Sequence, residues 1–329
     1  MVRQGKVTVV GAGAQGAAVA QRLAESGRAG TVVVTDAVHG RAEGLALDLG
    51  HCRPLTGGGA RVLGTTTGPD GSGYEETAGS QLVVFAAGVP PRPETCRAEH
   101  LERNAEMVRQ VVPPAVEASP EAVLLMLTSP VAELARVAQW ESGFVHGRVL
   151  GQTSALDSAR LAAFVAAELE VDPRRVRALA LGWYGEDLVP VVSRCTVDDR
   201  PLTDLLGAND IEDLAERTRY AGAEVISLTG SGAGLRAPAA AAARVAEAVL
   251  ADSREVLPVC AHVDGEFGIE DVWLGVEAEV GARGVHRVVD TPLTAEERCA
   301  LRAAGEAARP SQRLAVAGLA RSADLAAAS

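Results

Sequence analysis

The sequence contains a single lysine, Lys6, so the other 30 of its 31 basic residues are arginine. Three kinds of site need a lysine in the interior of the fold: the phosphate loop that ends in Gly-Lys-Ser/Thr, the Schiff base of pyridoxal phosphate, and the tyrosine–lysine pair of some dehydrogenases. Lys6 opens the first predicted strand and can serve none of them. The composition therefore excludes these chemistries.

Other residue types and patterns are also scarce. Aromatic residues make up 3% of the chain against 47% hydrophobic residues in all, which favours helices packed on strands over an aromatic-rich sandwich. The net charge is −12 and basic residues form no long run, which argues against a nucleic-acid partner. Because no apolar stretch is long enough to span a bilayer, we expect no membrane contact.

The cysteines are widely spaced and form no Cys-x-x-Cys pair. This spacing favours reduced thiols over a disulfide framework, and it predicts no metal site. The N-terminus runs into the first strand without a cleavable apolar segment. Together these features predict a soluble, cytoplasmic protein. The five cysteines are Cys52, Cys96, Cys195, Cys260 and Cys299.

At 329 residues the chain exceeds the usual size of one domain. Short apolar runs alternate with helical patterns over residues 1–150, which predicts an α/β domain with a doubly wound parallel sheet. Residues 151–309 predict a second, mixed α+β domain. Residues 310–329 show little apolar periodicity and are expected to form a flexible or weakly helical tail. The predicted strands are 6–10, 31–34, 60–63, 81–86, 122–127, 176–181, 188–197, 256–263, 272–276 and 284–289, and the predicted helices are 17–25, 40–49, 98–117, 155–170, 211–228, 237–251 and one from 294.

A glycine-rich turn follows the first predicted strand and opens a helix. It consists of Gly11, Ala12, Gly13, Ala14, Gln15 and Gly16. Gly11 permits the tight turn, Gly13 lets a pyrophosphate approach the backbone, and Gly16 lets the helix pack on the strand. Asp36 ends the second strand, where its carboxylate can bind ribose hydroxyls and repel a 2′-phosphate. The pattern predicts a Rossmann domain that binds NAD rather than NADP; the alternative is a glycine-rich turn without a nucleotide.

Ordered motifs along nearly the whole chain resemble the lactate and malate dehydrogenase family. They are residues 9–13, 86–90, 128–131, 149–152, 156–160, 185–190, 265–269 and 274–276. The resemblance covers residues 6–308 and implies a Rossmann NAD domain followed by a lactate/malate dehydrogenase-type domain. It also implies a homodimer or homotetramer and a small carboxylate substrate. Further cofactor-binding positions of the family fall on Ala87, Gly88 and Asn104.

The same resemblance implies roles for two arginines. Arg97 matches the arginine that polarises the substrate carbonyl, and Arg160 matches the one that binds the substrate carboxylate. A guanidinium suits both tasks, because it makes parallel charge-assisted hydrogen bonds and stabilises a developing oxyanion. Asp157 lies three residues before Arg160 on a predicted helix and can face the same site. It matches the family's aspartate that holds the acid/base residue, so the resemblance implies a catalytic role for it. The alternatives are a solvated loop charge for Arg97 and an ion pair for Arg160.

The chain departs from the family at the general acid/base. Tyr184 stands where the family has a histidine, and none of the six histidines occupies that turn. A free phenol has a pKa of about 10, so ionising it at neutral pH costs about 4 kcal/mol. A neighbouring Asp157 carboxylate would oppose that ionisation, whereas Arg97 or Arg160 would assist it. As a proton donor in the reducing direction, a neutral Tyr184 is less handicapped.

Positions expected to contact the substrate differ as well. Pro91 stands where malate-specific members carry an arginine for a second carboxylate, and its neighbour Arg92 is a candidate for that role. Ser129 replaces an asparagine, and Gly234 stands near a residue that walls the pocket. These changes indicate a rebuilt pocket for a larger or more anionic substrate.

Three functions remain open at this point. The first is a divergent NAD-dependent oxidoreductase acting on a carboxylate-bearing 2-oxo or 2-hydroxy acid. The second is a non-catalytic family member that binds NAD as a regulatory or structural subunit. The third is a different NAD-using reaction, such as oxidation–elimination or isomerisation. Retention of Arg97, Asp157 and Arg160 opposes complete loss of catalysis, but fold analogy alone does not choose.

Overall fold

The computed structural model describes residues 5–57, 59–89, 96–230 and 234–327, with side chains as far as residue 317. Its first half is a parallel sheet in the order β3-β2-β1-β4-β5-β6. Every residue of β4 and β5 is buried, as expected of strands covered on both faces. The strands are β1 (Gly5–Val10), β2 (Ala29–Asp36), β3 (Arg61–Thr66), β4 (Leu82–Phe85), β5 (Val123–Met126) and β6 (Val149–Gly151).

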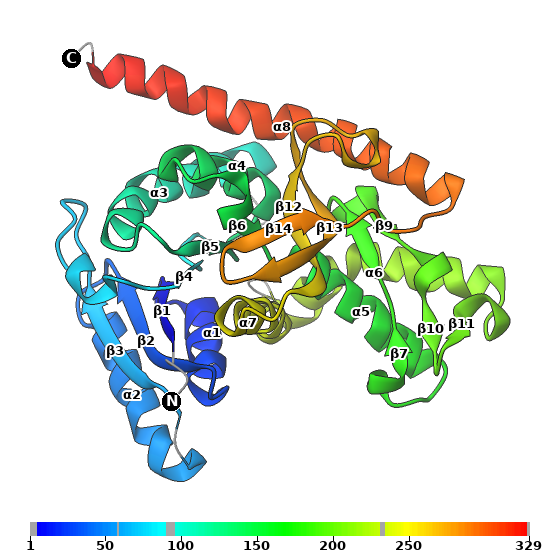
Figure 1. Cartoon of the computed structure of the whole chain (residues 1–329), viewed down its shortest axis with the longest axis horizontal. Helices are drawn as coiled ribbons and strands as arrows, with labels where there is room; N and C mark the ends of the chain where they lie inside the picture. Colours follow the sequence, from blue (N-terminus) through cyan, green and yellow to red (C-terminus); the bar gives the residue numbers. More distant parts are fainter. Residues whose placement is uncertain (1–4, 58, 90–95, 231–233, 328–329) are drawn as a thin grey trace.

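Helices cover both faces of this sheet. Figure 1 shows α3 and α4 above the sheet and α1 and α7 below it, so the sheet is doubly wound. The helices of the first half are α1 (Ala14–Glu25), α2 (Arg41–Thr56), α3 (Arg97–Ala118) and α4 (Val131–Ser142).

The second half extends the sheet with antiparallel strands. β12 pairs with β6 and with β13, and β13 in turn pairs with β14 and β8. The added strands are β8 (Ala180–Gly182), β9 (Leu188–Pro190), β12 (Glu255–Val263), β13 (Val272–Gly281) and β14 (Gly284–Val288), and a separate small sheet holds β7 (Val176–Arg177), β10 (Thr196–Val197) and β11 (Arg200–Pro201). The helices are α5 (Thr153–Glu168), α6 (Ala208–Thr229), α7 (Arg236–Ala251) and α8 (Ala295–Ala327).

Short 3-10 helices connect several of these elements. They are η1 (Tyr74–Thr77), η2 (His146–Arg148), η3 (Pro173–Arg175), η4 (Gly185–Asp187), η5 (Val192–Arg194), η6 (Leu202–Asp204) and η7 (Glu266–Gly268). The η4 turn joins β8 to β9 and contains the position after Tyr184. It therefore places the predicted acid/base residue at a strand end.

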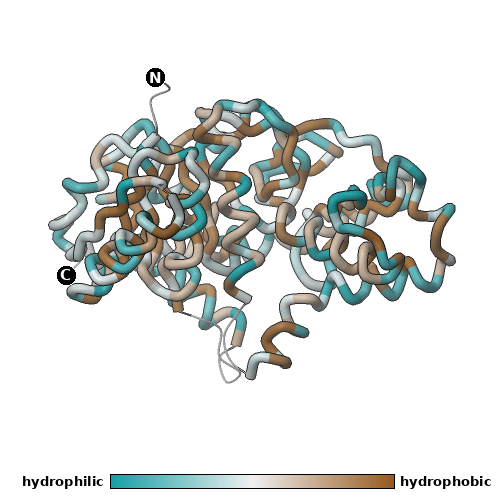
Figure 2. The backbone as a smooth tube through the Cα atoms, turned by 90° about the horizontal axis from the view of Figure 1, so that it is seen from below, coloured by the Kyte–Doolittle hydropathy of each residue, from teal (hydrophilic) through white to brown (hydrophobic). Residues whose placement is uncertain are grey.

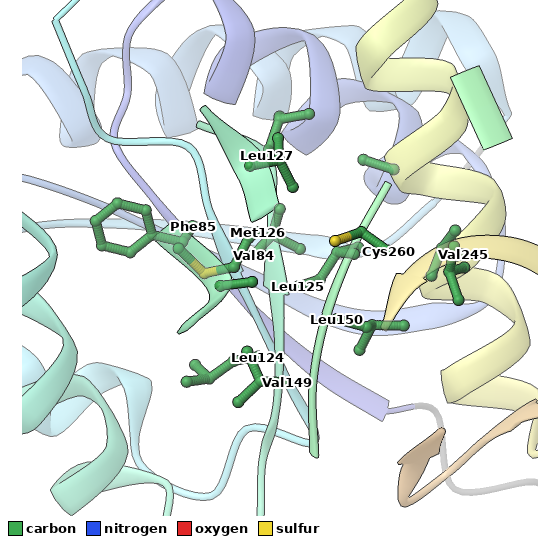
Figure 3. Packing of buried hydrophobic residues seen from close by; sticks show 14 of the residues in the cluster. Val84, Phe85, Leu124, Leu125, Met126, Leu127, Val149, Leu150, Val245 and Cys260 are labelled. Carbon is green, nitrogen blue, oxygen red and sulfur yellow. The ribbon is translucent and has the colours of Figure 1, made fainter. Parts of the chain in front are cut away.

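One hydrophobic core joins the two halves of the chain. Figure 3 shows side chains of the parallel sheet packed beside residues of α7 and β12, namely Val84, Phe85, Leu124, Leu125, Met126, Leu127, Val149, Leu150, Val245 and Cys260. A smaller cluster lies between α5, α6 and the small sheet. Figure 2 shows the corresponding larger and smaller lobes, with hydrophilic residues frequent on the outer turns.

The predicted fold class is confirmed, and three local predictions differ from the structure. Helix α4 was not predicted, and the predicted strands 176–181 and 188–197 are each divided into shorter elements. The expected tail continues helix α8 instead of fraying after residue 309. Gln312 is fully buried there, and its amide is satisfied by the backbone of β13. It donates to Trp273 O at 2.8 Å and accepts from Trp273 N at 2.9 Å.

Candidate active site

The glycine turn between β1 and α1 combines tight packing with one open position. Gly11 has a φ of +98°, and a Cβ there would lie 2.7 Å from the backbone of Ala87. A Cβ on Gly16 would lie 1.7 Å from the carbonyl oxygen of Gly11. By contrast, a Cβ on Gly13 would meet nothing within 4 Å. Gly11 and Gly16 therefore serve the packing, whereas Gly13 leaves free space for a ligand beside the helix.

The start of α1 is suited to an anion. Gly13 is its N-cap residue, no described side chain caps it, and its first turn holds no acidic residue. The first intrahelical hydrogen bond runs from Ala17 N to Gly13 O, so the N–H groups of Ala14, Gln15 and Gly16 are available to an anion. Asp36 lies beside this turn, because its carboxylate accepts hydrogen bonds from the N–H groups of Ala12 and Val38, both at 2.8 Å. These residues fit a dinucleotide with a free ribose 2′-hydroxyl.

Two more predicted cofactor residues lie next to this turn. A Cβ on Gly88 would lie 2.4 Å from Cγ2 of Thr128, so only glycine permits this approach. Asn104 is buried on α3, where its Oδ1 accepts from Val89 N and its Nδ2 donates to Ser129 O, both at 2.9 Å. The amide of Asn104 thereby fixes the segment after β4 to the segment after β5.

A cavity of about 530 Å³, here called the substrate cavity, gathers most of the predicted substrate residues. Seven predicted site residues line it: Gln15, Arg97, Ser129, Asp157, Arg160, Tyr184 and Gly234. It reaches the glycine turn, because Gln15 Nε2 donates to Gly234 O at 3.4 Å. Arg92 lies outside the described residues. The structure thus brings the predicted cofactor and substrate residues to one place.

Asp157 and Arg160 form an ion pair on α5. Arg160 Nη1 lies 2.9 Å from Asp157 Oδ1, and the two side chains are 21% and 9% exposed. Burial raises the pKa of Asp157 to about 6, and the guanidinium of Arg160 opposes this rise. Since one nitrogen of Arg160 holds Asp157 in place, the other donors remain for a carboxylate in the cavity.

Arg97 lies against two neighbouring aromatic rings. Its Cζ lies 4.4 Å from the ring centroid of Trp183 and 4.4 Å from that of Tyr184. Arg97 Nη2 also lies 3.0 Å from Glu133 Oε1, and Tyr184 Oη donates to the same oxygen at 3.5 Å. The carboxylate that faces Tyr184 is therefore Glu133, and not Asp157, which the sequence had suggested for this role.

Glu133 is the residue of this cluster that sequence analysis missed. Its side chain is 0% exposed on the first turn of α4, and burial raises its pKa although Arg97 and Ser311 lower it. Its second oxygen, Oε2, has no hydrogen-bond partner among the described residues. The indole of Trp183 lowers the pKa of the same carboxyl, although no hydrogen bond of good geometry joins the two groups. The sequence signal that could have revealed Glu133 is an acidic residue within the otherwise apolar run 131–135.

The described part of the chain holds no group of three His, Cys, Asp or Glu side chains that could bind a metal ion. The cysteines are free thiols. None of the described helices is both long enough and apolar enough to cross a bilayer.

A parallel sheet with a dinucleotide turn, joined to a domain that brings arginines and carboxylates to the same cavity, defines the class of two-domain NAD-dependent oxidoreductases. Two family models match the chain. The lactate/malate dehydrogenase NAD binding domain matches residues 5–151, and the alpha/beta C-terminal domain of the same family matches residues 154–310. The chain belongs to the lactate/malate dehydrogenase family.

Relatives and solved structures agree with this assignment. The malate dehydrogenase of Thermomicrobium roseum is 40% identical over 304 residues, covering 92% of this chain and 96% of that protein. The malate dehydrogenase structure from Salinibacter ruber is 36% identical with a TM-score of 0.87, covering 95% and 99% of the two chains. A Cryptosporidium parvum lactate dehydrogenase, solved with lactic acid and NAD, is 29% identical with a TM-score of 0.89, covering 96% and 99%. The resemblance inferred from the motifs and the assignment of NAD as cofactor are confirmed.

Proposed function

We propose that this chain oxidises or reduces a carboxylate-bearing 2-oxo or 2-hydroxy acid with NAD, in the manner of the malate and lactate dehydrogenases it resembles. The observation that carries the proposal is the substrate cavity, which holds Arg160, Arg97 and Tyr184 next to the glycine turn. When bound, NAD accepts or supplies the hydride. The remaining tasks, which are to hold the acid, polarise its carbonyl and move one proton, fall to side chains of the cavity.

Arg160 binds the substrate carboxylate in this proposal. Its guanidinium is held by Asp157 at 2.9 Å and is mostly buried, so it reaches the cavity in a fixed orientation. A planar guanidinium can make two parallel hydrogen bonds to a carboxylate, which a single ammonium group cannot. This contact selects acids and sets the orientation of the neighbouring carbonyl.

Arg97 and Tyr184 act on the carbonyl oxygen. A guanidinium beside the oxygen stabilises the negative charge that develops during reduction. The Tyr184 hydroxyl lies on the same wall, with its ring 4.4 Å from Arg97 Cζ, and donates the proton that completes the hydroxyl group. Acting as an acid, the phenol does not have to be ionised beforehand.

A dicarboxylic acid fits the remaining features best. Gly234 borders the cavity, and a Cβ there would meet only Val225 Cγ1, at 3.6 Å. Packing therefore does not require glycine at this position, and its small size leaves room for substrate. Ser129 borders the same cavity, and we assign Arg92 to the second carboxylate. The proposal includes a homodimer or homotetramer in the cytoplasm, as the family resemblance and the sequence suggest.

The test is a screen of NADH oxidation against a series of 2-oxo acids with the parent chain, Tyr184→Phe and Tyr184→His. We expect the parent to reduce at least one dicarboxylic 2-oxo acid. Tyr184→Phe should lower kcat by about 10²–10⁴-fold, the usual contribution of a general acid. Tyr74→Phe serves as the matched control, because Tyr74 is a buried tyrosine of η1 that does not line the cavity.

Two outcomes would contradict the proposal. If the parent is silent on all acids while Tyr184→His gains malate or lactate dehydrogenase activity, the chain is a non-catalytic binder of NAD or uses another reaction. If Tyr184→Phe is as active as the parent, Tyr184 is not the acid.

A further inference from the structure

Glu133 lies between two cavities and lines neither of them. The second cavity, also about 530 Å³ and here called the helical cavity, lies between α3 and α8 and is bordered by Leu101, Ala105, Arg109, Ser311 and Leu314. Figure 1 shows α8 lying across α3 and α4 on this side of the molecule. Arg97 borders both cavities. The buried carboxyl of Glu133 thus separates two hollow spaces.

A chain of hydroxyl and carboxyl groups connects the two spaces. Ser311 Oγ, on the border of the helical cavity, lies 3.3 Å from Glu133 Oε1. The same oxygen lies 3.5 Å from the hydroxyl of Tyr184, which borders the substrate cavity. All three groups can exchange protons or reorient a hydroxyl. Glu133 therefore contacts the hydroxyl of Tyr184 from outside the substrate cavity.

We propose that Glu133 is a proton relay, which takes protons from the helical cavity through Ser311 and returns them to Tyr184 after each reduction. The inference rests on the proposed function, because it concerns how Tyr184 regains its proton after each reduction. It assigns to Glu133, on α4, the place beside Tyr184 that the sequence had suggested for Asp157. It also gives the helical cavity a task, which is to hold the water that supplies the proton.

The proton balance closes over one cycle. The O–H bond of Tyr184 breaks and a new O–H bond forms on the reduced substrate, which leaves a phenolate. The protonated carboxyl of Glu133 then loses its proton to the phenolate oxygen and becomes a carboxylate. Water in the helical cavity protonates this carboxylate through the hydroxyl of Ser311, so one solvent proton is consumed for each hydroxyl group formed.

The surroundings of Glu133 support both of its charge states. Burial raises its pKa, which favours the protonated form that the relay needs at rest. Arg97 on α3 lies 3.0 Å from its Oε1 and stabilises the carboxylate that follows transfer. The other groups that face it are Tyr184 and Trp183 before η4, Ser311 on α8, and Cys260 on β12, whose own pKa is raised by burial and by the Glu133 charge.

The first test compares one turnover with many turnovers, using oxaloacetate and pyruvate as probes. With enzyme and NADH in excess over the probe, Glu133→Gln should oxidise NADH within about two-fold of the parent rate, since Tyr184 still holds its own proton. With the probe in excess, its kcat should fall about ten-fold or more. Glu133→Asp, which keeps a carboxyl, should recover part of this loss.

Two controls and one contrary outcome complete this test. Ser311→Ala should lower kcat less than Glu133→Gln does and leave the single turnover unchanged. Glu99→Gln makes the same chemical change on α3 outside both cavities, at an exposed carboxylate paired with Arg103, and should change neither rate. If Glu133→Gln slows the single turnover as much as kcat, Glu133 only positions Tyr184 and the relay is wrong.

The second test needs no turnover. The chain has three tyrosines, and the difference between the ultraviolet titrations of the parent and Tyr184→Phe isolates the phenol of Tyr184. The same difference, taken between Glu133→Gln and the double variant Glu133→Gln/Tyr184→Phe, should show the phenol of Tyr184 ionising at lower pH. The reason is that a neighbouring carboxylate opposes a phenolate, and Glu133→Gln removes it. Identical curves would overturn the relay even if neither probe is reduced, whereas a shifted curve without reduction would overturn only the proposed function. Thermal unfolding of each variant confirms that it is folded.

Discussion

Arg97 and Arg160 border the substrate cavity and each pairs with a buried carboxylate, but the two partners lie at different separations along the chain. Asp157 and Arg160 are three residues apart on one helix, whereas Arg97 and Glu133 are 36 residues apart on α3 and α4. Helix periodicity alone brings the first pair together. The second pair exists because α3 and α4 pack side by side on the sheet. Local spacing therefore reveals the arginine that we propose binds substrate, while the carboxylate beside the proposed acid/base residue emerges only from the tertiary fold.

The exposure of the two guanidinium groups also differs. The Arg160 side chain is 21% exposed and paired with Asp157, but the Arg97 side chain is 50% exposed and lies against the rings of Trp183 and Tyr184. Both carboxylates are buried, and burial raises both pKa values. We infer that the first pair is a rigid anchor for substrate, whereas the second is tied to the proton chemistry. Three variants test this division.

The largest effect is expected for Arg160→Lys. An ammonium group cannot reproduce the paired hydrogen bonds of a guanidinium, so kcat/KM for the preferred 2-oxo acid should fall about 10³-fold, mainly through KM. Steady-state kinetics measure this. Arg217→Lys is the control, because Arg217 lies exposed on α6 in an ion pair with Glu224. An unchanged KM would show that Arg160 is not the anchor.

The next effect concerns stability and Asp157. Its pKa is about 6 in the folded protein against 3.8 for an ordinary aspartate, so the folded state binds more protons between these values. Stability is therefore highest below about pH 4 for this group and falls as the pH rises to about 6, by about 3 kcal/mol. Asp157→Asn should flatten this part of the curve in urea unfolding at pH 4 to 7. Asp213→Asn, at an exposed position of α6, should leave the slope as it is.

The smallest effect is expected for Arg97→Lys. Lysine keeps the charge beside Glu133 but loses the planar stacking on Trp183 and Tyr184. We expect kcat to fall about ten-fold with little change in KM, since this arginine acts on the charge that develops in the transition state. If Arg97→Lys and Arg160→Lys both raise KM alone, the two arginines share one task and the division between the pairs fails.

The sequence was sufficient for the fold because its signals were local. Alternating strands and helices predicted the doubly wound sheet, and the glycine turn with Asp36 predicted the nucleotide site. Helix α4 lacked such signals, since its N-cap residue, Pro130, offers no capping side chain and residues 131–135 are all buried. Because α4 was not predicted, the sequence assigned Glu133 to no element of the fold.

The length of helix α8 was underestimated for a related reason. Its polar residues after position 309 obscure the apolar period, and one of them, Gln312, is buried through hydrogen bonds to β13. Such a side chain is stable inside the protein only when another element supplies both a donor and an acceptor. That partner, Trp273, lies 39 residues earlier in the chain, beyond the reach of any local pattern.

The pairing of β12 with β6 has a mechanical consequence. Cys260 of β12 lies opposite Gly151 of β6, at the junction of the two domains, and the hydrophobic core continues across it. A hinge at this junction would have to break backbone hydrogen bonds and expose apolar surface. We therefore expect the two domains to move as one body, and expect any movement that accompanies binding to occur in segments outside the shared sheet.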